Sequence, residues 1–111
     1  MKPLRWVGSA LTDLRAFPDD ARRVGGHNLH LVQLGLEAED WKPMPGVGPG
    51  VYGIRIHTTK EHRIFYVAKF EEGVYALHCF EKKARRTPSH HLEIGRERYR
   101  TLFRERRART N

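Results

Sequence analysis

Four basic residues in the middle of the chain have the types and spacing that phosphate chemistry requires. Arg55 and Arg63 lie in two neighbouring runs of alternating polarity, and Lys82 and Lys83 directly follow a third such run. If the three runs pair as an antiparallel meander, these cations meet at one end of a sheet. Fixed cations stabilise a phosphodiester and the extra negative charge of its transition state. A surface that only attracts an acidic partner would carry the same residue types, and the residues alone leave these two interpretations equal.

No other catalytic or metal-binding motif competes with this basic group. The chain has no Gly-x-Ser-x-Gly elbow, and its single cysteine, Cys79, lies in an apolar run that predicts a buried, inert thiol. His27 and His30 have an i, i+3 spacing without a third ligand nearby, which favours ordinary surface histidines. Glu71 and Glu72 fall in a predicted turn and are interpreted as solvated charges rather than a general acid–base pair. We therefore expect no metal and no cofactor.

Composition and charge narrow the classes of function. A formal net charge of +8 over 111 residues favours a polyanionic partner, either nucleic acid or an acidic protein. The length fits a single domain spanning residues 1–111. No apolar run approaches the ~18 residues of a membrane span, and residues 1–6 lead into no signal-peptide core. Because a lone cysteine allows no internal disulfide, a cytoplasmic protein without membrane contact is expected.

Three short runs predict the sheet that positions the basic group. They span residues 51–56, 63–70 and 74–80, are rich in β-branched and aromatic residues, and alternate with period two. Tight connections are predicted at residues 58–61 and 71–73. Alternation places Arg55 on the face opposite Tyr52, Ile54 and Ile56.

The flanking segments complete an α+β prediction: an N-terminal strand, two helices, the three-stranded meander and a C-terminal helix. Residues 3–7 predict the strand, and Ser9 predicts the cap of a helix that reaches Phe17. A second helix begins at residues 18–20, and the pair Gly25-Gly26 allows a kink or break within it. Residues 37–50 contain three prolines and three glycines, which predict a loop without regular structure.

A final helix is predicted to begin with Thr87 as its cap and Pro88 at its first position. One face of this helix is apolar and comprises Leu92, Gly95, Tyr99, Leu102 and Phe103. Residues 107–111 are expected to fray.

Three segments of the chain are similar to motifs of a known family: MPGVGPGVYGIRI at residues 44–56, RIFYVA at 63–68 and LHCFEKKARRTP at 77–88. Through them the chain resembles the phage-derived HigB branch of the RelE-type toxins, which has an H-x-F-x-K-K-x-x-x-T-P run similar to the third segment. It extends over nearly the whole chain, and the order of the expected elements agrees with the RelE-like toxin fold.

The resemblance implies the toxin of a type II toxin–antitoxin system, a metal-independent endoribonuclease that cuts mRNA, usually on the translating ribosome. In that family the ribose 2′-hydroxyl attacks the neighbouring phosphate and leaves a 2′,3′-cyclic phosphate and a 5′-hydroxyl. The implied partners are mRNA on the ribosome and a HigA-like helix-turn-helix antitoxin, and the toxin alone is expected to be monomeric. The alternative is a non-catalytic basic module, or a degenerate toxin, that binds an antitoxin or nucleic acid.

Matching the motif residue by residue implies a role for each member of the basic group. Arg63 matches the arginine that stabilises the phosphorane, and Arg55 lies near the residue that positions RNA or assists removal of the 2′-hydroxyl proton. Of Lys82 and Lys83, Lys83 is preferred for facing the leaving oxygen. The expected RNA contacts are Phe80 beside a base, Arg85 and Arg86 on backbone phosphates, and Lys69 and Tyr66 on the meander.

One feature of these toxins has no match in the sequence. Several relatives stack a C-terminal aromatic residue on the substrate base, and no corresponding tyrosine is found. His90 and His91 lie near this position, and His91 is the candidate acid or base because an imidazole titrates near neutral pH. Solvent-exposed residues in the first turn of a helix are the plainer interpretation of both histidines.

Overall fold

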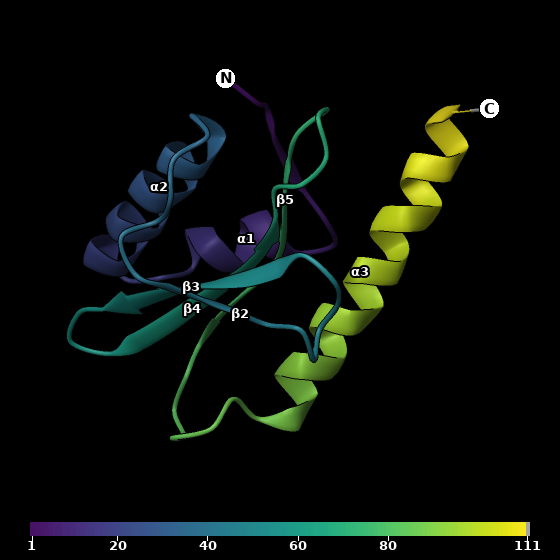
Figure 1. Ribbon diagram of the computed structural model, residues 1–111. Helices are drawn as coiled ribbons and strands as arrows, with labels where there is room; N and C mark the ends of the chain where they lie inside the picture. Colours follow the sequence, from purple (N-terminus) through teal and green to yellow (C-terminus); the bar gives the residue numbers. More distant parts are fainter. Residues whose placement is uncertain (111) are drawn as a thin grey trace.

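The computed structural model describes residues 1–110, which form one five-stranded sheet with helices on both of its faces (Figure 1). The strands are β1 (Leu4–Trp6), β2 (Trp41–Pro43), β3 (Val51–His57), β4 (Glu61–Val67) and β5 (Val74–Glu81). The helices are α1 (Ala10–Arg15), α2 (Asp19–Gln33) and α3 (Ser89–Thr110). Along the sheet the order is β1-β5-β4-β3-β2, with β1 parallel to β5 and the other neighbours antiparallel. The predicted α+β class and the predicted meander are confirmed.

Alternation along the central strands divides the core into two layers. Ile54, Ile56 and Ile64 belong to the layer that packs against α1 and α2, whereas Phe65 and Val67 belong to the layer beneath α3. Figure 1 shows α2 and α3 on opposite sides of the sheet. Successive side chains of a strand point to opposite faces, so the arginines of β3 and β4 share the α3 side with Phe65. The predicted facing of Arg55 away from Ile54 is therefore confirmed.

The pairing of β4 with β5 contains a one-residue shift that the sequence pattern did not predict. Phe65 pairs with His78 but Tyr66 pairs with Ala76, which leaves Leu77 as the extra residue of a bulge. Leu77 and the ring of His78 consequently both lie on the α3 side, where His78 stacks beside Phe80. Bulges of this kind change the direction of the following side chains. Here the bulge places Phe80 directly across from Arg63.

Helix α2 is continuous through Gly25 and Gly26, so the break that this pair allowed does not occur. The absence of a side chain at Gly25 lets the helix approach the sheet closely. A Cβ atom there would lie 3.1 Å from Ile64 Cδ1, 3.2 Å from Leu14 Cδ1 and 3.3 Å from Ile56 Cδ1. Each glycine makes the helix about 1 kcal/mol less stable than alanine would, and burial of this helix face offsets that cost.

Residues 37–50 were predicted to form a loop without regular structure, and this prediction is wrong for residues 41–43, which form the short edge strand β2. Pro43 pairs with Tyr52 at the outer edge of the sheet, where proline is tolerated because an edge strand can leave one side unpaired. The strand ends where the Met44 amide donates to the Val51 carbonyl oxygen at 2.8 Å. This edge strand carries Trp41 and Lys42 to opposite faces of the sheet.

Two predicted helix ends differ from the structure. Helix α1 ends at Arg15, before Phe17. Ser9 occupies the predicted cap position, but its hydroxyl donates to the Asp13 carboxylate at 2.8 Å instead of accepting from a backbone amide. Helix α3 begins at Ser89 rather than with a Thr87 cap, because the Pro88 carbonyl already accepts the amide of His91 at 3.0 Å.

Residues 107–110 belong to helix α3, and Asn111 lies outside the described residues, so the fraying expected for residues 107–111 stays a prediction. The end of α3 is held to the β4–β5 connection by an ion pair between Arg106 Nε and Glu72 Oε2 at 2.5 Å. Arg109 donates to the Tyr75 hydroxyl at 2.9 Å. Glu72 is therefore an anchoring group and not a solvated turn charge, whereas Glu71 is exposed as predicted. None of the helices within residues 1–110 has the length and apolar character needed to cross a membrane.

Candidate active site

A cavity of about 480 Å³ opens at the end of the sheet where β3 and β4 face the segment 82–88. It lies on the α3 side of the sheet, since its floor includes Phe65. Six of its lining residues are basic: Lys42, Arg55, Arg63, Lys82, Arg85 and Arg86. The remaining lining residues are Met44, Gly53, Phe65, Thr87 and Leu92, so no carboxylate from residues 1–110 lines the wall. We call this space the basic cavity.

The two arginines of the basic cavity stand directly opposite each other on β3 and β4. Arg63 is 9 % exposed, and its Nη1 donates to the His62 carbonyl oxygen at 3.0 Å and lies 3.3 Å from Glu61 Oε1. Arg55 donates from Nε to Asp40 Oδ1 at 2.7 Å. Each guanidinium is thus fixed by a carboxylate behind it. A fixed guanidinium can stabilise a charged transition state without first having to reorganise.

Lys82 contributes a third fixed cation and shapes the wall that faces the arginines. Its ammonium donates to the carbonyl oxygens of Ala84 at 2.8 Å and Arg85 at 2.5 Å, which curls the segment after β5 over the cavity. Burial and the positive charge of Arg63 lower the pKa of Lys82 below its usual 10.5, although Glu61 opposes this shift. A lysine with a lowered pKa is a better proton donor and acceptor near neutral pH.

Lys83 is exposed and is not among the residues that line the basic cavity. The structure therefore gives the wall position to Lys82, and not to the lysine preferred from the sequence. Arg85 and Arg86 do line the cavity, from a segment whose side chains are largely exposed. Guanidinium groups at this position can bind anionic groups such as phosphates.

Phe80 and His91 lie beside the basic cavity rather than on its wall. Phe80 is 5 % exposed and stacks on the His91 ring with centroids 3.9 Å apart. His91 is half-buried, not the exposed first-turn residue of the plainer interpretation, and its Nδ1 shares a hydrogen bond of 2.8 Å with His78 Nε2. Burial and nearby His90 lower the pKa of His91, and burial lowers that of His78 to about 4. These neutral rings pack the start of α3 onto β5.

Two residues predicted to contact RNA lie away from the basic cavity. Lys69 follows β4 at its other end, where its ammonium donates to the Pro49 carbonyl oxygen at 3.0 Å and lies over the rings of Phe70 and Tyr99. Tyr66 points to the opposite face of the sheet, where burial raises the pKa of its hydroxyl to about 12. The prediction for Cys79 is confirmed, since burial raises the pKa of its thiol to about 12 and 3 % of the residue is exposed.

In a comparison with curated proteins, none matches the chain significantly. Residues 12–100 match the family described as phage-derived protein Gp49-like (DUF891). The chain belongs to this family. Gp49-like proteins are toxins of the toxin–antitoxin type, related to RelE and HigB. Every residue that lines the basic cavity falls between positions 42 and 92, within the part of the chain that the Gp49-like family covers.

The sequence pattern missed an ion-pair relay that organises this Gp49-like site. His57 Nε2 lies 2.5 Å from Asp40 Oδ2, and His57 Nδ1 lies 2.6 Å from Glu61 Oε1. Because these two carboxylates also bind Arg55 and Arg63, five side chains form one continuous network. Burial disfavours the charged form of both carboxyl groups and so raises their pKa. Hydrogen bonds from His57 and from the arginines outweigh this effect, and the pKa of Asp40 and that of Glu61 lie below their usual values.

A signal for part of this relay was present in the sequence. His57 stands two residues after Arg55 and Glu61 stands two residues before Arg63, so alternation puts all four on one face. His57 and Glu61 then pair directly across the β3–β4 hairpin. Asp40 and Lys42 gave no such signal, because they belong to the segment that was predicted to be a loop.

Proposed function

We propose that this Gp49-like protein is the toxin of a type II toxin–antitoxin system and an endoribonuclease that cuts mRNA on the translating ribosome. The observation that carries the proposal is the basic cavity, in which Arg55, Arg63 and Lys82 are fixed around a space without a carboxylate on its wall. Membership of a toxin family supports the same conclusion. The cavity of about 480 Å³ has room for a phosphodiester with its adjoining sugars.

In the proposed reaction the nucleophile belongs to the substrate. The ribose 2′-oxygen bonds to the adjacent phosphorus and loses its proton, while the bond from phosphorus to the 5′-oxygen breaks and that oxygen gains a proton. The products are a 2′,3′-cyclic phosphate and a 5′-hydroxyl. Negative charge grows on the non-bridging oxygens as the phosphorane forms, which is where preorganised cations act most strongly.

The positions of the side chains support a division of roles. Arg63, buried and held by Glu61, faces the phosphorane oxygens. Arg55 stands opposite on β3 and orients the ribose and its 2′-hydroxyl. Lys82, whose pKa is lowered by burial and by Arg63, delivers the proton to the leaving 5′-oxygen. Arg85 and Arg86 hold phosphates of the incoming strand. A helix-turn-helix antitoxin of the HigA kind neutralises the protein.

Brief expression in bacterial cells tests this proposal. Wild-type protein is expected to stop growth and to produce breaks in translated mRNA that follow the reading frame. Arg63→Ala is expected to fold normally and to cleave about 100- to 1000-fold more slowly, the usual loss when one preorganised donor is removed. Arg23→Ala, an exposed arginine of α2, serves as the matched control and should remain toxic.

Each other outcome of the expression experiment has a definite meaning. A stable Arg63→Ala protein that is as toxic as wild type would remove this site from the proposal. Breaks that do not follow the reading frame would support ribonuclease activity but would exclude its dependence on the ribosome. Intact mRNA in the presence of soluble wild-type protein would favour a basic module that binds without cleaving.

A further inference from the structure

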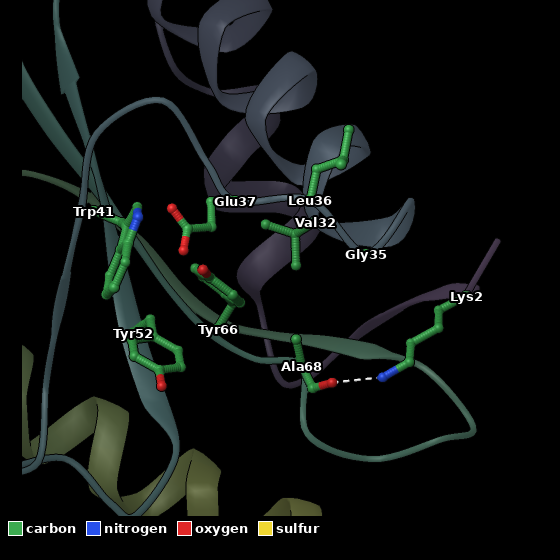
Figure 2. Close-up of a pocket in the computed structure, with 9 residues that line it drawn as sticks. All are labelled: Lys2, Val32, Gly35, Leu36, Glu37, Trp41, Tyr52, Tyr66 and Ala68. Carbon is green, nitrogen blue, oxygen red and sulfur yellow. Dashed lines mark hydrogen bonds between the residues drawn. The ribbon is translucent and has the colours of Figure 1, made fainter.

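A second hollow, of about 290 Å³, lies on the other face of the sheet (Figure 2). It is bordered by the C-terminal end of α2 and by strands β2, β3 and β4. Its walls include the rings of Trp41, Tyr52 and Tyr66, which alternation directs away from the basic cavity. We call this hollow the aromatic pocket. Nothing in the proposed cleavage reaction uses it.

Three aromatic rings from three neighbouring strands form one side of the aromatic pocket. The rings of Trp41 and Tyr52 meet edge-on with centroids 5.2 Å apart, and those of Tyr52 and Tyr66 are 5.9 Å apart. Burial, followed by the nearby Tyr52 and Glu37, raises the pKa of the Tyr66 hydroxyl to about 12, which keeps this ring neutral. Neutral aromatic faces attract organic cations, and walls built from several rings are the usual receptor for them.

A carboxylate without a partner completes the aromatic pocket. The segment after α2 has three acidic residues: Glu39 lies 3.5 Å from His27, and Asp40 binds Arg55 and His57. Glu37 forms no hydrogen bond or ion pair with any residue of the described part of the chain, positions 1–110. Figure 2 shows its carboxylate between Trp41 and Tyr66.

The cation at the far end of the pocket does not neutralise Glu37. The Lys2 ammonium donates to the Ala68 carbonyl oxygen at 2.6 Å, which holds it on the opposite side of the pocket (Figure 2). Although the protein has a net charge of +8, the Glu37 carboxylate beside three aromatic faces makes this pocket attractive to a positively charged ligand.

An exposed leucine lines the aromatic pocket, and a second lies two residues before it in the sequence. Leu36 is 57 % exposed and lines the pocket, and Leu34, which directly follows α2, is 50 % exposed. A free cation would leave these side chains in water, whereas a polypeptide could cover them with residues on either side of its basic residue. We propose that the aromatic pocket binds an arginine side chain of a partner polypeptide. A guanidinium fits best because it stacks on aromatic faces and pairs with a carboxylate through two parallel hydrogen bonds.

A titration of the isotopically labelled full chain with two small probes tests the chemistry. N-acetyl-arginine amide is expected to shift the indole resonance of Trp41, which Trp41→Phe assigns. The neutral isostere N-acetyl-citrulline amide is expected to bind at least fivefold more weakly. Glu37→Gln should weaken binding of the arginine probe about tenfold, because the guanidinium loses a charged hydrogen-bond partner. Glu39→Gln is the matched control and should change nothing.

Equal binding of the arginine and citrulline probes would overturn the proposal, as would full affinity in Glu37→Gln. Because Glu37 is exposed, this variant is expected to fold as the wild type does, and its amide spectrum verifies this. Its rate of RNA cleavage should also be unchanged, which separates a failure here from a failure of the proposed function.

A second comparison distinguishes a polypeptide from a free cation. The peptide acetyl-Leu-Arg-Leu-amide should bind more tightly than N-acetyl-arginine amide, and Leu36→Ser should remove that advantage. Spermidine that binds as tightly as the peptide would assign the aromatic pocket to free polyamines and overturn the assignment to a partner polypeptide.

Discussion

At the scale of single residues, the central feature is that the catalytic arginines of the proposed site do not stand alone. Arg55 and Arg63 are joined through Asp40, His57 and Glu61 by contacts of 2.5 to 3.3 Å. Asp40 binds Arg55 and Glu61 binds Arg63, and only His57 connects these two ion pairs. With it, the distance between the arginines is set by a chain of hydrogen bonds as well as by the strand pairing.

His57 is therefore predicted to be a positioning residue. His57→Ala should lower the cleavage rate about 10- to 100-fold, because small displacements of catalytic groups are costly. Binding of RNA should change much less, since neither guanidinium is lost. Single-turnover cleavage on programmed ribosomes, measured over a range of enzyme concentrations, separates the two effects. His27→Ala, which removes an exposed histidine that also faces a carboxylate, is the control; equal rates for both variants would refute the role.

Lys82 and Lys83 provide a matched pair that tests the proton donor. Lys82→Ala should lower the cleavage rate about 10²- to 10⁴-fold, the range for loss of a general acid, whereas Lys83→Ala should have a small effect. A general acid works only while protonated, so the wild-type rate should fall as pH rises through the Lys82 pKa, which lies below 10.5. Lys82→Arg should lose this alkaline decline, because a guanidinium stays protonated. A larger loss in Lys83→Ala would reverse the assignment.

At the scale of elements, the meander was predictable because its three runs combine period-two alternation with clear turns. The bulge at Leu77 was not, since a single extra residue leaves the composition of the strand unchanged. Its consequence is large for the site: without the shift, Phe80 would lie on the α1 and α2 side and could not pack beside Arg63. The start of α3 differed from the prediction because a backbone hydrogen bond, from the His91 amide to the Pro88 carbonyl oxygen, sets it and not a Thr87 side-chain cap.

The anchoring of α3 gives a pH-dependent prediction. The hydrogen bond from Arg106, opposed by burial, lowers the pKa of Glu72 from 4.5 to about 2. A carboxyl whose pKa is lower in the folded state stabilises the fold above its unfolded pKa. This contribution is lost as pH falls from about 4.5 towards 2.

The protection of the amides in the last two turns of α3, measured as the hydrogen-exchange rate relative to the intrinsic rate at each pH, should therefore decrease over this pH window in the wild type. In Glu72→Gln this protection should already be low at neutral pH and should change little with acid. Glu71→Gln, which alters the exposed neighbour, is expected to behave as wild type. Identical profiles for all three proteins would mean that other contacts hold the helix.

At the scale of the whole molecule, the sheet separates two surfaces of different chemistry. The α3 side bears six basic residues around one cavity, whereas the other side bears three aromatic rings and the Glu37 carboxylate, which has no partner among residues 1–110. Strands β2, β3 and β4 contribute to both, because neighbouring positions such as Tyr52 and Gly53 point to opposite faces. The net charge of +8 predicted a polyanionic partner but not this division.

The sequence predicted the basic group from charge and alternation, and the structure brings together Arg55, Arg63, Lys82, Arg85 and Arg86 around one cavity. The choice between Lys82 and Lys83 depended on the curl of residues 82–88, which backbone carbonyl bonds determine and side-chain patterns do not. Tyr66 has an aromatic character that suits RNA, but only the pairing of β4 shows that it faces the other layer. The types of the site residues could thus be interpreted from the sequence more easily than the directions in which their side chains point.

The most direct test of the cleavage mechanism is the chemistry of the RNA ends. Purified protein should be mixed with ribosomes that hold a defined mRNA, and both new termini should be identified. Cleavage in the basic cavity predicts a 2′,3′-cyclic phosphate on one fragment and a 5′-hydroxyl on the other, nearly absent with Arg63→Ala and unchanged with Arg23→Ala. New ends bearing a 5′-phosphate, or the same fragments from Arg63→Ala, would contradict it.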